Sequence, residues 1–469
     1  MIKNKLFKKI FKSVIAVTLV FLLFIVAGIV VPYIKHKDVD SEVAHACIDK
    51  EYLGANEYGE RIRHIKSNVE ALEMRLALIN SAKSEIILTT FELGNDESGR
   101  DIISALANAA QRGVKVKVLV DAYKGGDLNS NDWLRYLSTL ENAEIKLYNP
   151  LNPFMPWRSQ SRMHEKYMIF DGQTYILGGR NTNDIFLGNY NEEKANADRD
   201  ILVYTETPSE GSTVVQLRSY FEEYFAHEHC DTYKYSKGKS SEKVMERYES
   251  LKALYPSAFT ELDMDALTYP VGKITLLTGE IVTGKKAPNI WYQMVDIMLR
   301  GENIIIQSPY VMLGKDMSED LHALAFSRDV SLMINSPLVG TNKFGNADYT
   351  NNKEKVWGLG MTTYEHIGEV SHHSKTVVVD DRISIVGSFN FDMRSAYIDS
   401  EIMLVIDSAQ LNNELRVELD RMTAWSREIR SGGFTDYGEY YVEPEEKSVW
   451  ERAGRLFMRA FTIPIRFLL

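Results

Sequence analysis

The stretches RMHEKYMIFD (residues 162–171) and SHHSKTVVVD (residues 371–380) decide the fold of this chain. Both contain the pattern His-x-Lys-x4-Asp, and both continue with a glycine 14 residues after the histidine and an asparagine 17 residues after it. One copy of so short a pattern arises easily by chance, but two copies that agree beyond their defining residues indicate an internal repeat. The shared residues are His164, Lys166, Asp171, Gly178 and Asn181 in the first copy, and His373, Lys375, Asp380, Gly387 and Asn390 in the second.

The surroundings of the two motifs repeat as well. Upstream of each, a β-branched stretch, a helical pattern and a second strand pattern follow one another, and another strand follows each motif. We therefore expect an α/β fold of two pseudo-symmetric repeats packed around one shared active site. The expected elements are strands at 84–90, 114–120, 174–177, 303–307, 330–335 and 383–386, and helices at 102–110 and 319–326.

The expected boundaries follow from this repeat and from shifts in composition. The first repeat is placed at residues 60–233 and the second at 264–430. A polar, helix-prone linker at 234–263 joins them. At 469 residues and 45% apolar content, the chain can bury a large core.

The N-terminus predicts a membrane anchor. A basic cytoplasmic segment (residues 1–13) precedes an apolar segment at 14–34, slightly longer than the ~20 residues that cross a bilayer as a helix. Because five lysines precede the span and only Lys35 and Lys37 follow it closely, the body is expected outside the cytoplasm. The alternative is a cleaved signal sequence, with Ala44-His45-Ala46 as the cleavage site.

The charge balance bears on the substrate. The formal net charge is −11, and because residues 1–40 carry seven basic and only two acidic residues, the remainder has a net charge of −16. A groove that binds a nucleic-acid backbone needs positive charge. The balance therefore disfavours a nuclease.

The paired motifs suggest phosphodiester chemistry. Histidine and lysine at positions i and i+2 of a strand project to the same face, so two packed halves would bring together two of each, together with two asparagines. Lysine and asparagine can hold phosphate oxygens without a metal, one histidine can attack phosphorus, and the other can protonate the leaving oxygen. The phosphate-binding residues are expected to be Lys166, Asn181, Lys375 and Asn390, with no metal or other cofactor.

The two motifs, each followed by Gly-x-x-Asn, resemble the phospholipase D superfamily over about residues 60–430. RMHEKYMIFD with GGRNTNDIF, and HSKTVVVDDRISIVGSFNFDMRS, resemble bacterial cardiolipin synthases, particularly the C-type. The resemblance implies a metal-independent phosphatidyltransferase. It also implies that His164 is the nucleophile and His373 the general acid.

The resemblance further implies that an acidic residue on the strand after each asparagine orients a histidine. Glu401 and Asp200 are the residues that match this place. Asp171 and Asp380 complete the catalytic motif, and we expect them to fix its turn rather than to perform chemistry. Gly179, where the second half has Ser388, resembles the synthase branch.

Several smaller signals leave alternatives open. Cys47 and Cys230 are either free or form one bridge; residues 227–230 (HEHC) resemble a metal cluster but are better explained as a helix end. Residues 148–157 form either a packed loop or the rim of a lipid entrance. Arg394 either meets a headgroup or braces the motif loop. The C-terminal amphipathic segment 445–469 is either a helix docked on the core or an interfacial membrane helix.

Together these signals predict a membrane-anchored, outward-facing bacterial enzyme of cardiolipin synthase type. It would transfer a phosphatidyl group from phosphatidylglycerol to a second phospholipid headgroup alcohol, with phosphatidylglycerol or phosphatidylethanolamine as acceptor, through a phosphohistidine. The alternatives are a hydrolytic phospholipase D, a phosphodiesterase acting on nucleic acid, and a non-catalytic envelope scaffold. The intact motifs disfavour the scaffold, and no nucleic-acid partner is expected.

Overall fold

The computed structural model describes residues 2–236, 241–368, 370–444 and 448–469. The predicted basic segment, linker, second repeat and C-terminal segment each lie partly outside the described residues, at residue 1, residues 237–240, residue 369 and residues 445–447 respectively.

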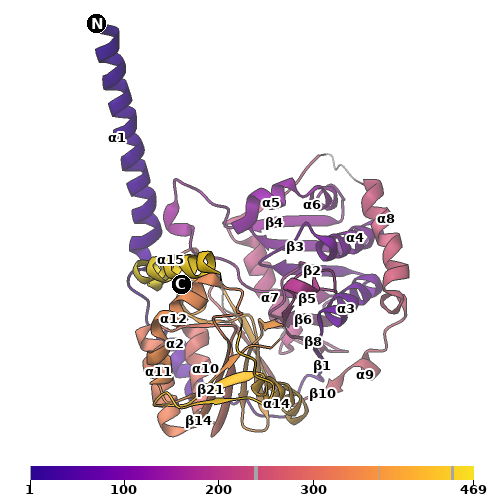
Figure 1. Cartoon of the computed structure of the whole chain (residues 1–469). Coiled ribbons are helices and arrows are strands. Elements are labelled where there is room, and N and C mark those ends of the chain that lie inside the picture. The colour runs from indigo at the N-terminus through magenta and orange to yellow at the C-terminus, as the bar shows by residue number, and fades with distance from the viewer. Residues whose placement is uncertain (1, 237–240, 369, 445–447) are drawn as a thin grey trace.

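Within this described part of the chain, two mixed sheets of nine strands each form the body (Figure 1). Eight successive strands correspond between the sheets in order and in pairing direction, which confirms two pseudo-symmetric α/β halves. The first sheet has the order β10 (Tyr269–Pro270), β1 (Arg61–Ile65), β8 (Asp200–Tyr204), β6 (Thr174–Gly178), β5 (Tyr167–Phe170), β2 (Glu85–Thr90), β3 (Lys115–Asp121), β4 (Ala143–Tyr148) and β9 (Cys230–Thr232). The second has the order β11 (Ile274–Thr278), β20 (Ile402–Asp407), β18 (Ile383–Gly387), β17 (Lys375–Val379), β12 (Asn303–Gln307), β14 (Asp329–Asn335), β15 (Thr362–His366), β21 (Ser426–Ile429) and β22 (Thr435–Tyr437).

Alternating side chains along a strand pack in different hydrophobic cores. In β17, Val377 and Val379 face the outer core of the second half, whereas Val378 faces a core shared by both halves. The outer core of the first half contains α3 (Asn68–Ser81), α4 (Glu97–Gln111), α6 (Asp132–Leu137) and α8 (Ser241–Leu254); that of the second contains α10 (Asn289–Leu299), α11 (Lys315–Ser327), α12 (Lys343–Trp357) and α13 (Met393–Tyr397). The shared core contains α7 (Thr213–Ala226) and α14 (Ala409–Thr423).

The elements expected around the motifs are present with shifts of a few residues. The strand patterns correspond to β2, β3, β6, β12, β14 and β18, and the two helical patterns lie within α4 and α11. Asp96 caps α4 by accepting a hydrogen bond from the Gly99 amide (3.1 Å), which explains why this helix begins before its apolar pattern.

Much of the predicted linker belongs to the first half. Val244, Tyr248 and Leu251 of α8 are buried in the first core, where α8 packs against α4. After α9 (Met264–Leu267), β10 pairs with β1 at the edge of the first sheet. The first half therefore extends beyond residue 263, because β10 pairs with a strand of its sheet.

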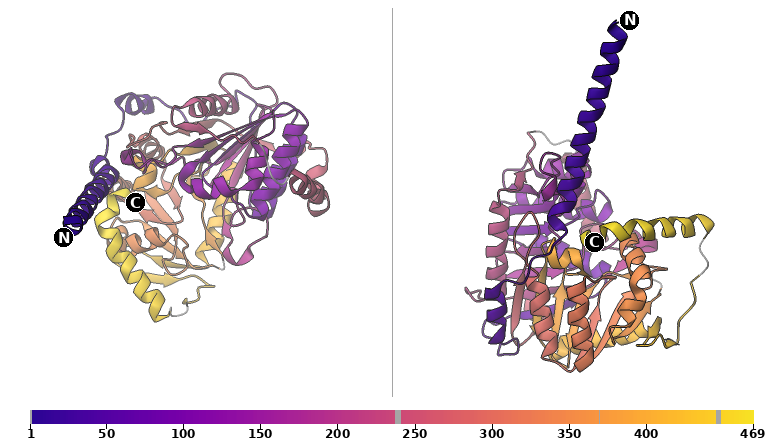
Figure 2. Two further views of the ribbon diagram at one scale, coloured as in Figure 1. Left: turned by 90° about the horizontal axis from the view of Figure 1, so that it is seen from above. Right: turned by 90° about the vertical axis from the view of Figure 1, so that its left-hand side faces the viewer.

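Helix α1 (Ile2–Val30) projects away from both halves (Figures 1 and 2). The span from Phe7 to Tyr33 is long and apolar enough to cross a membrane, and it is not buried by the body. At its base, Tyr33 is buried in the second core and α2 (Ser41–Ile48) packs against α10. The C-terminal helix α15 (Val449–Ile465) lies across the base of α1.

Candidate active site

Each motif histidine lies just before a central strand, where the two halves meet. The backbone amide of His164 donates to the carbonyl of Ser400 (3.1 Å), and that of His373 donates to the carbonyl of Ala197 (2.7 Å). The short strands β7 (Asn196–Ala197) and β16 (Ser371–His372) pair across the halves next to this contact. Each histidine is thus positioned by backbone from the other half of the chain.

The side chains repeat this exchange. Nδ1 of His164 lies 3.0 Å from Oε1 of Glu401, and Nδ1 of His373 lies 2.7 Å from Oδ2 of Asp198. A carboxylate can only accept, so it holds the proton of each ring on Nδ1. Nε2 of each ring is then the unprotonated nitrogen. Glu401 therefore contacts a motif histidine, and that histidine, His164, belongs to the opposite half.

The prediction of Asp200 as the second orienting residue is wrong. Its carboxylate accepts from Arg75 (2.9 Å) and forms an ion pair with Arg180 (3.3 Å), and it contacts neither histidine. All three side chains are buried. Asp200 therefore neutralises two buried guanidinium groups beneath the site.

Strand pairing explains the two-residue error. Gly178 lies opposite Asp200, whereas the corresponding Gly387 lies opposite Met403. Counting back two residues, the counterpart of Glu401 is Asp198, which lies nearer the histidines on the same face of the chain. In the sequence, both Asp200 and Glu401 immediately precede an apolar run. This similarity led to the alignment of Glu401 with Asp200 instead of Asp198.

The two carboxylates have different surroundings. Glu401 accepts from the hydroxyls of Ser388 and Ser395 (2.6 Å to the latter), and burial raises its pKa to about 7 despite the nearby charge of Lys166. Burial would also raise the pKa of Asp198, but the hydrogen bond and charge of His373 outweigh it and the pKa is lowered. The site therefore pairs one firmly ionised carboxylate with one that titrates near neutrality.

Glycine on the first side reflects a lack of space. A Cβ atom at Gly179 would lie 2.5 Å from Oδ2 of Asp198, so no side chain fits beside this carboxylate. In the second half the corresponding Ser388 donates its hydroxyl to Glu401. Glycine at position 179 thus leaves room for Asp198, whereas serine at position 388 supplies a hydrogen bond to Glu401.

Both motif lysines lie against their histidines. Lys166 donates to the carbonyl of His164, and Nζ of Lys375 lies 2.9 Å from Nδ1 and 3.0 Å from Nε2 of His373. Burial lowers the pKa of Lys166 to about 7 and that of Lys375 to about 8. Burial and the lysine charges also lower the pKa of both histidines, to about 3 for His373. Such a site favours a bound anion, which would restore the lysine charges.

The two motif asparagines, Asn181 and Asn390, are linked to His164 and Glu401 through intervening residues. Oδ1 of Asn181 accepts from the amide of Glu92 (3.3 Å), next to Phe91, whose ring packs 5.2 Å from that of His164. The backbone amide of Asn390 donates to the hydroxyl of Ser395, and that hydroxyl donates to Glu401. Both asparagines are buried, and Oδ1 of Asn390 has no partner among the described residues.

The motif aspartates lie at the far ends of the strands. Asp171 accepts from the amides of Ser84 (2.7 Å) and Glu85 (3.0 Å), and Asp380 accepts from those of Glu302 and Asn303 (2.9 Å each). Both aspartates have positive φ, at 52° and 46°. Within the described chain neither contacts a motif histidine or lysine, so they fix the turn, as we expected, rather than touch the site.

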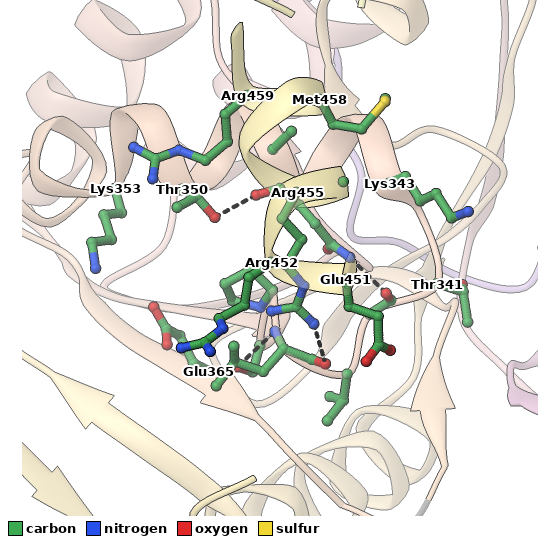
Figure 3. Close-up of a pocket in the computed structure, with 18 of the residues that line it drawn as sticks. Thr341, Lys343, Thr350, Lys353, Glu365, Glu451, Arg452, Arg455, Met458 and Arg459 are labelled. Carbon is green, nitrogen blue, oxygen red and sulfur yellow. Dashed lines mark hydrogen bonds between the residues drawn. The ribbon is translucent and has the colours of Figure 1, made fainter. Parts of the chain in front are cut away.

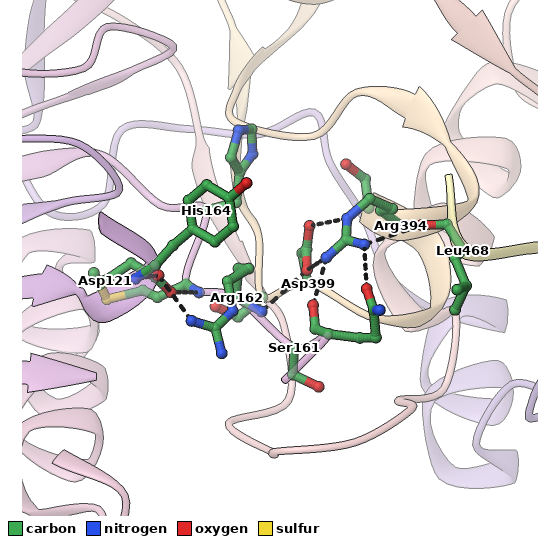
Figure 4. A network of polar contacts seen from close by, with 12 residues as sticks. Asp121, Ser161, Arg162, His164, Arg394, Asp399 and Leu468 are labelled. Carbon is green, nitrogen blue, oxygen red and sulfur yellow. Dashed lines mark hydrogen bonds and ion pairs between the residues drawn. The ribbon is translucent and has the colours of Figure 1, made fainter. Parts of the chain in front are cut away.

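Buried ion pairs hold the chain that leads into His164 (Figure 4). Asp121 accepts from Arg162 (3.2 Å) and from the amide of Met163 (2.7 Å). Arg394 forms an ion pair with Asp399 (3.0 Å) and donates to the carbonyl of Leu468 (3.0 Å). Of the two roles considered for Arg394, the structure therefore shows the brace, which also holds the C-terminus beside the site.

Sequence reasoning missed several residues of the site. Phe91 and Phe186 pack against the rings of His164 and His373, and the buried Lys286 acts on the pKa of Glu401. Asp198 was also missed, although matching the strand pairs of Gly178 and Gly387 would have found it. The aromatic residues carry no such positional signal.

The two cysteines and the HEHC segment (residues 227–230) form neither a disulfide nor a metal site among the described residues. Cys47 packs in the second half and Cys230 lies on β9 of the first sheet, and both thiols are free. His227 and His229 pack ring to ring at the end of α7. Across the residues described, no group of three or more His, Cys, Asp or Glu side chains is placed to hold a metal ion.

Comparison with known proteins agrees with this geometry. The family model described as "Cardiolipin synthase, PLD-like domain" matches residues 76–225 and 296–423, which is more than half of the chain. The chain belongs to this family. It is therefore an enzyme of the phospholipase D superfamily.

Individual relatives cover most of the chain. Cardiolipin synthase C of Escherichia coli is 25% identical over 86% of this chain and 95% of its own, and the major cardiolipin synthase of Bacillus subtilis is 26% identical over 81% and 71%. The crystal structure of phosphatidylserine synthase from Haemophilus influenzae superposes with a TM-score of 0.64 at 17% identity, over 91% of this chain and 99% of that one. This likeness confirms the fold.

Proposed function

We propose that this member of the family is a membrane-anchored phosphatidyltransferase of cardiolipin synthase type. The observation that carries the proposal is the exchange of carboxylates, in which Glu401 holds His164 and Asp198 holds His373 across the two halves. Two oriented imidazoles with buried lysines beside them form a single site for displacement at a phosphodiester. The names of the relatives support a phospholipid as the phosphodiester.

In the first step, Nε2 of His164 attacks the phosphorus of phosphatidylglycerol. The N–P bond forms as the bond from phosphorus to the headgroup glycerol oxygen breaks, and His373 gives its proton to that oxygen. Lys166, Lys375, Asn181 and Asn390 surround the phosphate oxygens. The enzyme then holds a phosphatidyl group on His164, and glycerol leaves.

In the second step, the headgroup hydroxyl of another phospholipid replaces the glycerol. His373, now neutral, takes the hydroxyl proton while the oxygen attacks phosphorus and the N–P bond breaks. With phosphatidylglycerol as acceptor the product is cardiolipin. Phosphatidylethanolamine has no free headgroup hydroxyl, so as acceptor it would attack phosphorus through its amine. An N–P bond to the lipid would form as the bond to His164 breaks, His373 would take the amine proton, and the product would be an N-phosphatidyl lipid.

The unlike carboxylates support this division of roles. A general acid must hold a proton, but without a bound anion burial and Lys375 lower the pKa of His373 to about 3. The firmly ionised Asp198 opposes this shift, and the negative charge of a bound phosphate would oppose it further, so that His373 can be protonated when the substrate is bound. A nucleophile must be neutral, and His164 faces Glu401, whose pKa of about 7 leaves less negative charge to stabilise a protonated ring. The predicted assignment of His164 as nucleophile and His373 as acid is therefore retained.

The anchor supports a lipid substrate. α1 can span a bilayer, and Phe154 and Trp157 of the predicted entrance loop pack against Phe21 and Phe24 of α1. That loop continues directly into the motif of His164. We propose a single-pass bacterial membrane protein with the catalytic body on the outer side, because the lysines before the span exceed those after it.

A hydrolytic phospholipase D is the second candidate. It would use the same site and the same intermediate, with water in place of the acceptor alcohol. A nucleic-acid phosphodiesterase is less well supported because the body is acidic.

The deciding experiment incubates the purified full-length chain with radiolabelled phosphatidylglycerol in micelles, with and without EDTA, and resolves the products. We expect cardiolipin and free glycerol, unaffected by EDTA. Phosphatidic acid as the sole product would replace the proposal with hydrolysis, and loss of turnover on chelation would contradict the two-histidine mechanism.

Trapping the intermediate tests the roles of the two histidines. His373→Ala should accumulate one labelled phosphatidyl group per chain, because attack is retained while proton transfer is slowed, and His164→Ala should accumulate none. The reverse pattern would exchange the roles, and two labels per chain would contradict a single shared site.

A further inference from the structure

Helix α15 docks on the body by its polar side. Arg455 donates to the carbonyl of Leu338 (3.1 Å), Arg459 to Oδ1 of Asn351 (2.8 Å), and Thr462 is fully buried against α12. Of the two alternatives for this segment, the docking of its apolar stripe on the core does not match the structure. The polar stripe makes the contact instead.

The apolar stripe of α15 faces outward. Trp450 is 87% exposed, and Val449, Leu456, Phe457 and Ile463 are each about two-thirds exposed. A contiguous exposed apolar stripe on an amphipathic helix is typical of a helix that lies in a membrane interface. Because α15 lies across the base of α1 (Figures 1 and 2), the bilayer spanned by α1 is the occupant that fits this stripe.

A cavity of about 1020 Å³ lies between α15 and the second half (Figure 3). Its lining carries six cationic side chains and two acidic ones, in a chain whose net charge is −11. One cation, Arg427, is already paired with the acidic Glu365 (2.6 Å). The other five are Lys343, Lys353, Arg452, Arg455 and Arg459.

These five cations have no acidic partners in the part of the chain that the structure describes. Among the described residues, none of them forms an ion pair with a carboxylate, while the exposed apolar side chains of Leu456 and Phe457 lie at the edge of the same cavity. No motif histidine, lysine or asparagine lines it. The cavity is therefore a second site, with a cationic interior and an apolar edge.

We propose that this cavity binds the phosphate headgroup of an anionic phospholipid that remains in the bilayer beneath α15. The lipid phosphate would accept hydrogen bonds from Lys343 and Arg452, and the acyl chains would follow Leu456 and Phe457 into the membrane. The bound lipid holds α15 and the second half against the membrane. This site is separate from catalysis and does not depend on the proposed transfer reaction.

The test titrates the full-length chain in neutral detergent with dioleoyl phosphatidic acid and counts bound lipid by native mass spectrometry. The cavity variant is Lys343→Gln with Arg452→Gln, two exposed side chains whose loss leaves the core intact. The matched control is Lys243→Gln with Lys315→Gln, which removes the same charge from α8 and α11. We expect the cavity variant to bind one lipid at least about tenfold more weakly than the control.

Two further arms identify the ligand. Dioleoyl phosphatidylcholine should not displace the phosphatidic acid, because its headgroup has no net charge, and soluble glycerol 3-phosphate at the same concentration should not displace it either. Equal lipid binding by the two variants would overturn the proposal. Displacement by glycerol 3-phosphate would overturn it in favour of a soluble phosphoester. Phosphoenzyme formation, measured in parallel, should be the same in both variants, which separates this test from that of the proposed function.

Discussion

At the scale of single residues, the site depends on two carboxylates that differ in charge rather than in position. Glu401 and Asp198 occupy corresponding positions just before β20 and β8. Glu401 accepts from the hydroxyls of Ser388 and Ser395 and has a raised pKa, whereas the pKa of Asp198 is lowered. Identical acids would give the two histidines identical basicity. The difference between them favours protonation of His373 over that of His164 when a phosphate is bound.

The corrected partner of His373 leads to a paired prediction. Asp198→Asn should lower kcat about a thousandfold with little change in KM, because the amide no longer stabilises the protonated ring of His373. Asp200→Asn should instead leave the charges of Arg75 and Arg180 uncompensated and lower the free energy of unfolding by about 3 kcal/mol. Steady-state kinetics and thermal unfolding of both variants check this. A stable but inactive Asp200→Asn with an active Asp198→Asn would restore the original assignment.

The pKa of Glu401 predicts the acid limb of the pH profile. Below about pH 7 its carboxyl is protonated and no longer accepts from Nδ1 of His164, so kcat/KM should rise as pH increases through 7. Ser388→Ala removes a hydrogen bond that lowers this pKa, so the limb should move about one pH unit upward. The control is Ser384→Ala. Ser384 is also buried and lies on β18, but it does not bond Glu401. A limb that stays in place in Ser388→Ala would show that another group titrates.

Most site residues could be predicted from the repeated motif, because spacing along a strand fixes which side chains share a face. His164, Lys166, His373 and Lys375 lie where the pattern places them. Asp198 could not be found from its distance along the chain from His164, because six more residues lie between Asn181 and Asp198 than between Asn390 and Glu401. Only strand pairing, which depends on tertiary structure, fixes that register.

At the scale of elements, α15 is the segment whose composition and environment disagree most. Its pattern of apolar residues correctly predicted an amphipathic helix, but not which side would face the body. The polar side docks because α12 presents Asn351 and the neighbouring loop presents the carbonyl of Leu338 as acceptors for arginines. Periodicity alone carries no information about the surface that a helix will meet.

Fluorescence from Trp450 can test whether the apolar stripe of α15 lies in the membrane interface. In vesicles of phosphatidylcholine with brominated acyl chains, fluorescence from Trp450 should be strongly quenched, because bromine atoms in the bilayer reach an interfacial indole. Trp450→Phe should therefore reduce the quenchable part of the emission. Trp425→Phe is the control, since Trp425 packs on Tyr440 within the second half. Equal quenchable emission in both variants would place α15 in water.

At the scale of the whole molecule, the membrane-facing parts gather on one side of the body. The base of α1, the loop with Phe154 and Trp157, and α15 lie together, and the C-terminal carbonyl of Leu468 bonds Arg394 beside the motif of His164 (Figures 2 and 4). Under the proposed function, this arrangement would let a phospholipid reach the histidines without leaving the membrane interface.

The orientation of this assembly across the membrane is the last property to test. Five lysines before the span should keep the N-terminus in the cytoplasm and place the body outside. With Cys47 and Cys230 replaced by serine, Lys243→Cys on the exposed side of α8 should react with a membrane-impermeant maleimide in intact spheroplasts, whereas Lys8→Cys should react only after permeabilisation. If Lys243→Cys also required permeabilisation, the catalytic body would face the cytoplasm and draw its phosphatidylglycerol from the inner leaflet.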